Sequence, residues 1–170
     1  TSVASGYTTV SATGLKGPFI LDGAARGTTA MTITSGTAAD TIAMENVADV
    51  LDAGTGTDTL KLYGNFGANV AIDLSATDQV TITNGVANSA VQKGFENVDV
   101  SGLTIATNVA ITGTTGTDII TGNAGVDTIT PGLGTDTITP GAGADIIDLT
   151  ESTQSVDILE YGNTTNIKAT

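Results

Sequence analysis

The sequence predicts an all-β solenoid of short strands, and three observations lead to this prediction. Four nine-residue units follow one another without a gap from residue 113 to residue 148. A more degenerate block with the same nine-residue period occupies residues 35–61. The intervening residues 62–112 alternate apolar and polar side chains, which is typical of half-buried strands. A fixed period of this kind indicates an architecture in which each unit stacks on its neighbours.

Each of the four regular units consists of a turn followed by a strand. They read GTTGTDIIT, GNAGVDTIT, PGLGTDTIT and PGAGADIID, with Gly at the fourth position, Asp at the sixth and Ile at the eighth. Gly, Pro, Asn and Thr fill the first six positions and indicate a turn. The last three positions are rich in Ile and Thr, which favour a strand. Because one Ile per unit cannot form a core alone, we expect these Ile side chains to pack on one another in stacked coils.

The Asp residues recur at one position of the turn, so stacking brings their carboxylates together. A row of carboxylates repels itself unless a cation neutralises it. A hard cation with oxygen ligands fits such a row, and carbonyl groups of the turns can fill the remaining coordination positions. The repeat therefore predicts turns that bind a hard cation.

This stretch resembles the RTX nonapeptide repeat family, whose consensus is G-G-x-G-x-D-x-U-x, where U is a large apolar residue. The match holds at positions four, six and eight, whereas Pro131 and Pro140 replace the first Gly, and Thr114 and Asn123 replace the second. The resemblance implies a right-handed parallel β-roll or β-helix solenoid in which two units form one coil. It also implies several Ca²⁺ ions, held between turns that lie two units apart.

Carried onto this sequence, the resemblance implies that Asp118 shares a site with the turn around Asp136. Asp127 would share one with the turn around Asp145, and backbone carbonyls of the same turns would complete each shell. The candidate metal ligands of this part of the chain are Asp118, Asp127, Asp136, Asp145, Gly116, Gly125, Gly134, Gly143, Thr115, Asn123 and Asp148.

The degenerate block reads SGTAADTIA, MENVADVLD and AGTGTDTLK. Asp40 and Asp58 occupy the sixth position two units apart, with Asp49 between them. We predict that Asp40 and Asp58 share one Ca²⁺. The alternative is a set of strands that keep the pattern without metal.

The chain is predicted to form a single domain over residues 1–170. Its last segment carries Asp157, Glu151 and Glu160, which either finish the last metal site or form a solvated acidic cap. The predicted segments are N-terminal cap strands (1–34), degenerate RTX units (35–61), irregular coils (62–112), four RTX nonapeptides (113–148) and a C-terminal cap (149–170).

Composition excludes several classes of partner. The net charge is −13 and the pI is about 4.1, which argues against nucleic acid and anionic membrane surfaces. We expect no membrane insertion, because the longest apolar runs are far shorter than the roughly 18 residues that a spanning helix needs. The chain has no Cys and no His, so it has neither disulfides nor the commonest general base.

The sequence predicts no enzymatic activity. Its carboxylates recur every nine residues on turns, which is typical of metal structure rather than of one active site. The Ser residues have no His partner, and no G-x-S-x-G or phosphate-binding motif occurs.

These features favour a calcium-dependent structural module of a secreted, cell-surface protein. The segment GFENVDVSG resembles linkers of long RTX surface proteins, including S-layer proteins, so we expect self-association into a surface lattice. The family resemblance implies type I secretion and an extracellular location. Because the chain lacks an initial Met and a visible signal peptide, we expect a fragment or a processed product.

Two alternatives remain open. The first is an RTX adhesin segment that acts as a spacer or binds a cell-surface glycan, ice or another surface; TIT at 128–130 and 137–139 is a pattern that ice binders display. The second is a non-catalytic module of a secreted polysaccharide enzyme.

Overall fold

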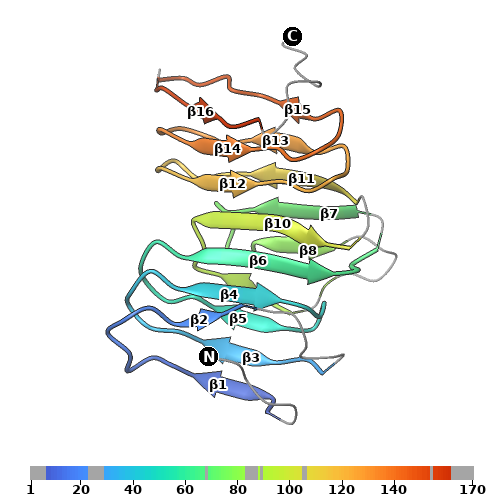
Figure 1. Ribbon diagram of the computed structural model, residues 1–170. Coiled ribbons are helices and arrows are strands. Elements are labelled where there is room, and N and C mark those ends of the chain that lie inside the picture. Colours follow the sequence, from blue (N-terminus) through green and yellow to red (C-terminus); the bar gives the residue numbers. More distant parts are fainter. Residues whose placement is uncertain are drawn as a thin grey trace.

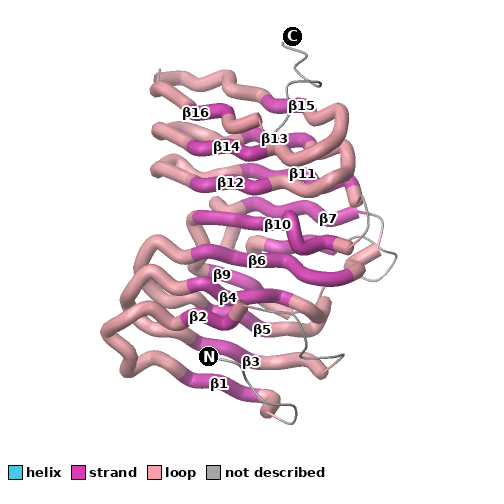
Figure 2. The backbone as a smooth tube through the Cα atoms, viewed as in Figure 1, coloured by secondary structure: helices cyan, strands magenta, loops and turns pink. Residues whose placement is uncertain are grey.

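The computed structural model describes residues 7–22, 29–67, 69–82, 88, 90–104, 107–153 and 155–161. Within these residues the chain forms short strands joined by turns and contains no helix (Figures 1 and 2). The predicted all-β class is confirmed. The described part also has no helix long and apolar enough to span a membrane.

Two nine-residue units form one coil, as the resemblance implied. The last three positions of the four regular units form β12 (Ile119–Thr121), β13 (Thr128–Thr130), β14 (Thr137–Thr139) and β15 (Ile146–Ile147). β12 pairs in parallel with β14, and β13 pairs in parallel with β15. Consecutive strands therefore belong to opposite faces of the solenoid, and equivalent strands lie 18 residues apart.

The strands form three sheets. The seven-stranded sheet follows one face of the solenoid along its length (Figure 1). The other two sheets divide the opposite face between them. The seven-stranded sheet has the order β16 (Ile158–Leu159), β14, β12, β10 (Asn97–Leu103), β6 (Thr59–Gly64), β4 (Thr41–Met44) and β2 (Ile20–Leu21). The five-stranded sheet has the order β15, β13, β11 (Asn108–Thr112), β7 (Asn69–Asp73) and β8 (Val80–Ile82). The four-stranded sheet has the order β1 (Thr9–Ser11), β3 (Thr32–Thr34), β5 (Val50–Asp52) and β9 (Gln92–Lys93).

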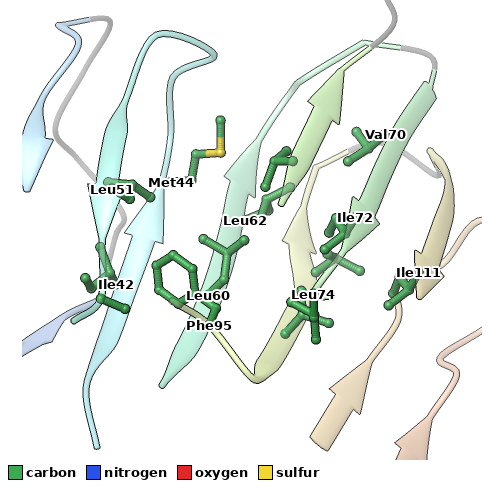
Figure 3. Close-up of a cluster of buried hydrophobic side chains, with 14 of the residues drawn as sticks. Ile42, Met44, Leu51, Leu60, Leu62, Val70, Ile72, Leu74, Phe95 and Ile111 are labelled. Atoms are coloured by element: carbon green, nitrogen blue, oxygen red, sulfur yellow. The ribbon is translucent and has the colours of Figure 1, made fainter. Parts of the chain in front are cut away.

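The core contains ladders of aliphatic side chains, and in the ladder of each face a coil contributes one residue. The eighth-position residues pair directly across the parallel strands, so each meets its equivalent in the next coil. Figure 3 shows the middle of this core, where Ile42 and Leu60 lie near Phe95. In the seven-stranded sheet the paired residues are Leu21, Ile42, Leu60, Val98, Ile120, Ile138 and Leu159. The expected stacking of like residues is confirmed, and this continuous ladder joins the two repeat blocks.

Residues 62–112 depart from regular coiling in one place. β8 runs antiparallel to β7, whereas the other strand pairs of the described residues are parallel. The buried Gln79 fixes this hairpin, because its Nε2 donates to the carbonyls of Leu74 and Phe95, both at 2.7 Å. Its Oε1 accepts the Phe95 N–H at 3.0 Å. Period-two alternation predicts strands but not their pairing direction, so the hairpin was not predicted.

Candidate metal sites in the stacked turns

The turns of the repeats line the two edges of the solenoid. Each turn precedes its strand, and consecutive strands run in opposite directions on the two faces, so consecutive turns lie on opposite edges (Figure 1). Stacking therefore produces two columns of acidic residues. The first column, next to the seven-stranded sheet, contains Asp40, Asp58, Glu96, Asp118, Asp136 and Asp157. The second column, next to the five-stranded sheet, contains Asp127 and Asp145.

Hydrogen bonds link neighbouring members of the first column. In each linked pair, the carboxylate of one coil accepts the backbone N–H of the acidic residue in the preceding coil. Between Glu96 and Asp118 the link differs, because Asn97 Oδ1 accepts the Ile119 N–H at 2.7 Å. The carboxylate links are Asp40 N–Asp58 Oδ1 (2.7 Å), Asp58 N–Glu96 Oε2 (2.8 Å), Asp118 N–Asp136 Oδ1 (2.8 Å) and Asp136 N–Asp157 Oδ1 (3.0 Å).

The second column has the same construction. Asp145 Oδ1 accepts the Asp127 N–H at 3.0 Å, and Asp127 Oδ1 accepts the Val109 N–H at 2.9 Å. In both columns, one oxygen of each linked carboxylate thus accepts a hydrogen bond from the backbone of the preceding coil. The position of the other oxygen decides what the turn can bind.

Carbonyl oxygens of the turns lie beside these carboxylates. The stacked turns approach so closely that a Cβ on Gly134 would lie 2.1 Å from the Gly116 carbonyl oxygen. A Cβ on Gly143 would lie 1.8 Å from the Gly125 carbonyl oxygen and 2.9 Å from Asp145 Oδ1. Only glycine fits at these positions, and its missing side chain lets carbonyl and carboxylate oxygens of stacked turns come close to one another. Such an all-oxygen set is the kind that Ca²⁺ prefers.

The backbone conformation at the second position of the unit separates turns in which the remaining carboxylate oxygen has a partner from turns in which it has none. Asp118 Oδ2 accepts the Thr114 N–H at 2.5 Å, and Asp127 Oδ2 accepts the Asn123 N–H at 2.9 Å. The Thr114 hydroxyl also donates to Asp118, at 2.8 Å. In these turns the carboxylate is satisfied by its own turn.

Two other turns leave that oxygen free. Asp58 Oδ2 and Asp136 Oδ2 are buried and have no hydrogen-bond partner in the described part of the chain. The second position of both turns is a glycine with positive φ, namely Gly54 (85°) and Gly132 (101°). A buried carboxylate oxygen without a partner is costly. These two oxygens are therefore the strongest sign that the turns are built for a cation.

Burial weakens the acidity of these groups. Desolvation raises the pKa of Asp58 to about 6 and the pKa of Asp136 to about 6. Neighbouring carboxylates push in the same direction, whereas backbone hydrogen bonds oppose them. Desolvation also raises the pKa of Asp118 and of Asp127. A bound cation would favour the ionised form in each case.

Two basic side chains of the described residues, Lys61 and Lys93, form ion pairs away from the columns. Lys61 Nζ lies 3.6 Å from Asp22 Oδ1 and 3.4 Å from Asp99 Oδ2, and Lys93 Nζ lies 3.0 Å from Asp52 Oδ2. None of these ion pairs includes a column residue. The residues of the columns therefore fit an oxygen-ligated metal ion better than an internal salt bridge.

The structure brings together the three predicted carboxylate pairs, Asp40 with Asp58, Asp118 with Asp136, and Asp127 with Asp145. The Asn123 carbonyl faces Gly141 in the next turn, while its Nδ2 donates to the Thr107 carbonyl at 2.9 Å. Thr115 is exposed. The roles of these residues as calcium ligands stay predictions.

Asp148 lies outside both columns. It follows β15 at the outward-facing ninth position, and its side chain is exposed. Its Oδ1 accepts the Thr150 N–H at 3.0 Å, and hydrogen bonds from Thr150 lower the pKa of its carboxyl. The geometry gives it no partner in the neighbouring turns, so its predicted role as a ligand has no support from position.

Glu96 belongs to the first column although the sequence did not single it out. It lies two residues before the core residue Val98, which is the same offset that separates Asp118 from Ile120. This offset was the available signal. It was obscured because the surrounding GFENVDVSG lacks the glycine pattern of the repeats.

Comparison with known protein families supports a calcium-binding role. Residues 112–147 match the model of the RTX calcium-binding nonapeptide repeat, in four copies. Neither a curated protein nor a solved structure matched the chain. Repeats of this family bind Ca²⁺ at several sites, and the closely stacked turn carbonyls and the unpartnered carboxylate oxygens fit such sites. Residues 112–147 are accordingly a block of RTX-type calcium-binding nonapeptide repeats.

Proposed function

We propose that this chain is a calcium-dependent structural module of a secreted cell-surface protein of the S-layer type, without catalytic activity. It folds and then assembles when it meets Ca²⁺ outside the cell. The observation that supports this proposal is the pair of buried, unpartnered carboxylate oxygens of Asp58 and Asp136 in stacked turns. A chain that buries such groups gains stability from an ion that only the folded state can bind.

The expected gain per site is small. Weak extracellular calcium modules have dissociation constants of about 10⁻⁴ to 10⁻³ M. At free Ca²⁺ of about one to ten times the dissociation constant, each site adds roughly 0.4 to 1.4 kcal/mol by mass action. A single ion therefore does not decide folding, whereas several ions acting together do.

The contacts between stacked coils couple the calcium sites to one another. Each coil contacts only its neighbours, so an ion that orders one turn also orders the interface with the next coil. Where cytoplasmic Ca²⁺ is scarce, the carboxylates would repel and the segment would stay unfolded, which suits export. Outside, Ca²⁺ would fill the sites and drive a steep transition.

Assembly would also depend on the cation. A net charge of −13 opposes contact between copies until divalent ions neutralise it. At one end of the described solenoid, β15 and β16 have no further neighbour in their sheets. Ile146 and Ile158 are exposed on these strands, at 60% and 50%. An unpaired strand edge with apolar side chains is a surface on which another copy can stack.

The test is a Ca²⁺ titration from a chelated start, with far-ultraviolet circular dichroism and light scattering recorded together. We expect β-signal to rise steeply first and scattering to rise at higher Ca²⁺. A β-signal without scattering, together with glycan or cell binding, would instead support an adhesin segment. A protein that is fully folded in chelator would overturn the folding mechanism. Release of sugar products from a polysaccharide would overturn the absence of catalysis.

A further inference from the structure

The end of the first column holds a cluster of acidic side chains that is unlike the sites between the repeats. One carboxylate oxygen from each of Asp136, Glu151 and Asp157 lies within 4.8 Å of the other two. Asp136 belongs to the last turn on this edge that comes from the regular units. Glu151 and Asp157 come from residues 149–157, beyond the segment that matches the nonapeptide family.

Each of the three carboxylates is held by hydrogen bonds through one oxygen. Asp136 Oδ1 accepts the Asp118 N–H at 2.8 Å, and Asp157 Oδ1 accepts the Asp136 N–H at 3.0 Å. Glu151 Oε2 accepts the Ser155 N–H at 3.0 Å and is also bonded by the Ser155 hydroxyl. The cluster is therefore oriented by the backbone rather than made of loose surface acids.

The other oxygens of two of these carboxylates are buried and unpaired. Asp136 is fully buried, and its Oδ2 has no partner in the described part of the chain. Glu151 Oε1 is likewise a buried atom without a partner there. Two unpaired carboxylate oxygens, next to a third carboxylate, give a formal charge of −3 with no basic side chain paired to it among the described residues. A positive ion is the group that this arrangement lacks.

We propose that Asp136, Glu151 and Asp157 form a Ca²⁺ site that fastens the closing segment, residues 149–160, onto the repeats. All donors are oxygen atoms, which selects a hard cation. Glu151 lies in a connection rather than in a repeat turn, and a flexible, irregular set of carboxylates suits Ca²⁺ better than Mg²⁺, which demands near-octahedral geometry. The site differs from those between nonapeptides because three carboxylates, rather than stacked turn carbonyls, supply its core.

Two consequences follow from this composition. Affinity for Ca²⁺ rises with the number of charged ligands, so this site binds more tightly than the repeat sites and fills first. It also controls the docking of β16. That strand pairs with β14 through the Ile158 N–H to the Asp136 carbonyl, at 2.7 Å, and the Glu160 N–H to the Ile138 carbonyl, at 2.8 Å. Asp136 supplies both a carboxylate to the site and the carbonyl that accepts the Ile158 N–H, and Asp157 directly precedes β16, so loss of the ion loosens the strand.

The experiment compares the whole chain with Glu151→Gln and with the matched control Glu160→Gln. Both changes remove one negative charge from the closing segment, but Glu160 is exposed and lies outside the cluster. Ca²⁺ stoichiometry and stepwise affinity are measured by calorimetry. Exchange of the Ile158 and Glu160 amides is followed by hydrogen–deuterium exchange at saturating Ca²⁺. We expect Glu151→Gln to lose the tightest step, or weaken it at least tenfold, and to exchange faster at these amides.

The outcomes separate this site from the proposed function of the whole chain. Equal stoichiometry, affinity and exchange in Glu151→Gln, Glu160→Gln and the unchanged chain would overturn the site. If Asp127→Asn loses an ion while Glu151→Gln does not, the repeat sites stand and this one fails. If Glu151→Gln loses an ion while the β-signal never depends on Ca²⁺, this site stands and the folding mechanism fails.

A second variant keeps the test informative if Glu151→Gln folds poorly. Ser155→Ala removes the hydroxyl that orients Glu151 but leaves all three carboxylates in place. We expect a weaker loss of affinity at the same tight step. A Ser155→Ala protein with unchanged tight binding would count against the proposed orientation of Glu151.

Discussion

The two carboxylate oxygens of Asp136, at the sixth position of its repeat, have different environments. Its Oδ1 accepts the Asp118 N–H of the preceding coil, whereas its Oδ2 is buried without a partner in the described part of the chain. The same holds for Asp58 in the other repeat block. Both carboxyls therefore prefer either a proton or a metal ion, and pH should decide between these two states.

Without metal, acidification should favour the folded state. The pKa of Asp58 and of Asp136 is about 6 when folded, above the usual value of 3.8, so the folded chain binds protons more tightly than the unfolded chain. This contribution to stability is fully present below pH 3.8 and is lost as pH rises through about 6. In chelator, we expect β-signal and melting temperature to increase from pH 7 to pH 5. With limiting Ca²⁺ the order should reverse, because the ion needs ionised carboxylates.

Asp136→Asn provides the matched control for this pH dependence. The amide oxygen can still accept the Asp118 N–H, but the group no longer titrates. The variant should show less pH dependence in chelator and a weaker response to Ca²⁺. A β-signal in chelator that falls between pH 7 and pH 5 in the unchanged chain would contradict the argument.

At Gly132, both the backbone conformation and the close contact with a stacked turn disfavour any side chain. Its φ is 101°, and a Cβ would lie 2.0 Å from the Thr114 carbonyl oxygen. Backbone strain alone costs about 1–3 kcal/mol at such a position. Gly132→Ala should therefore lower the free energy of unfolding by at least this amount, measured by urea denaturation in saturating Ca²⁺. Gly17→Ala is the control, because a Cβ there meets no atom within 4 Å, and it should change stability little.

At the scale of the element, β12 shows how one short strand separates core from surface. Ile120 is fully buried in the ladder, whereas its neighbour Ile119 is 54% exposed. Side chains alternate across a strand, so adjacent identical residues have opposite environments. The parallel register then places Ile120 between Val98 and Ile138.

This contrast gives a direct test of the ladder. Ile120→Ala should destabilise the folded protein by about 2–5 kcal/mol, because it removes a buried side chain and leaves a cavity. Ile119→Ala removes the same atoms from an exposed position and should change stability by about 0.5 kcal/mol or less. Urea denaturation in saturating Ca²⁺ measures both. Comparable decreases in the free energy of unfolding of the two variants would show that the stacked Ile side chains do not stabilise the core.

At the scale of the whole molecule, the two repeat blocks form one continuous structure. β6, from the degenerate block, and β12, from the regular block, both pair with β10. Glu96, which precedes β10, accepts the Asp58 N–H at 2.8 Å and stands between the two blocks in the first column. The blocks are far apart in the sequence but adjacent in the solenoid.

This continuity predicts that the blocks respond to Ca²⁺ together. In hydrogen–deuterium exchange along a Ca²⁺ titration, the amides of β4 and β6 should gain protection with the same midpoint as those of β12 and β14. Glu96→Ala should separate the two midpoints, because it removes the acceptor that joins the two blocks within the first column. Two well-separated midpoints in the unchanged chain would mean that the blocks fold independently and that the column is not shared.

The sequence by itself determined the features that repeat. Nine-residue spacing fixed the turn-and-strand unit, the eighth-position core and the recurrence of Asp on one side of each turn, because each follows from local residue preference and from stacking of like units. The spacing identified Asp40, Asp58, Asp118, Asp127, Asp136 and Asp145 as recurring turn carboxylates, and the family resemblance implied which of them pair.

Only the tertiary structure decided the features that depend on contacts between non-repeating segments. The antiparallel direction of β8, the place of Glu96 in the first column, the exposure of Asp148 and the meeting of Glu151 with Asp136 have no periodic signal. Whether an Asp oxygen stays free depends on the backbone of its turn, where Gly132 has a positive φ and Thr114 does not. Sequence spacing gives the position of a residue along the chain. Its hydrogen-bond and carboxylate partners depend on how the irregular segments fold back onto the solenoid and pack against it.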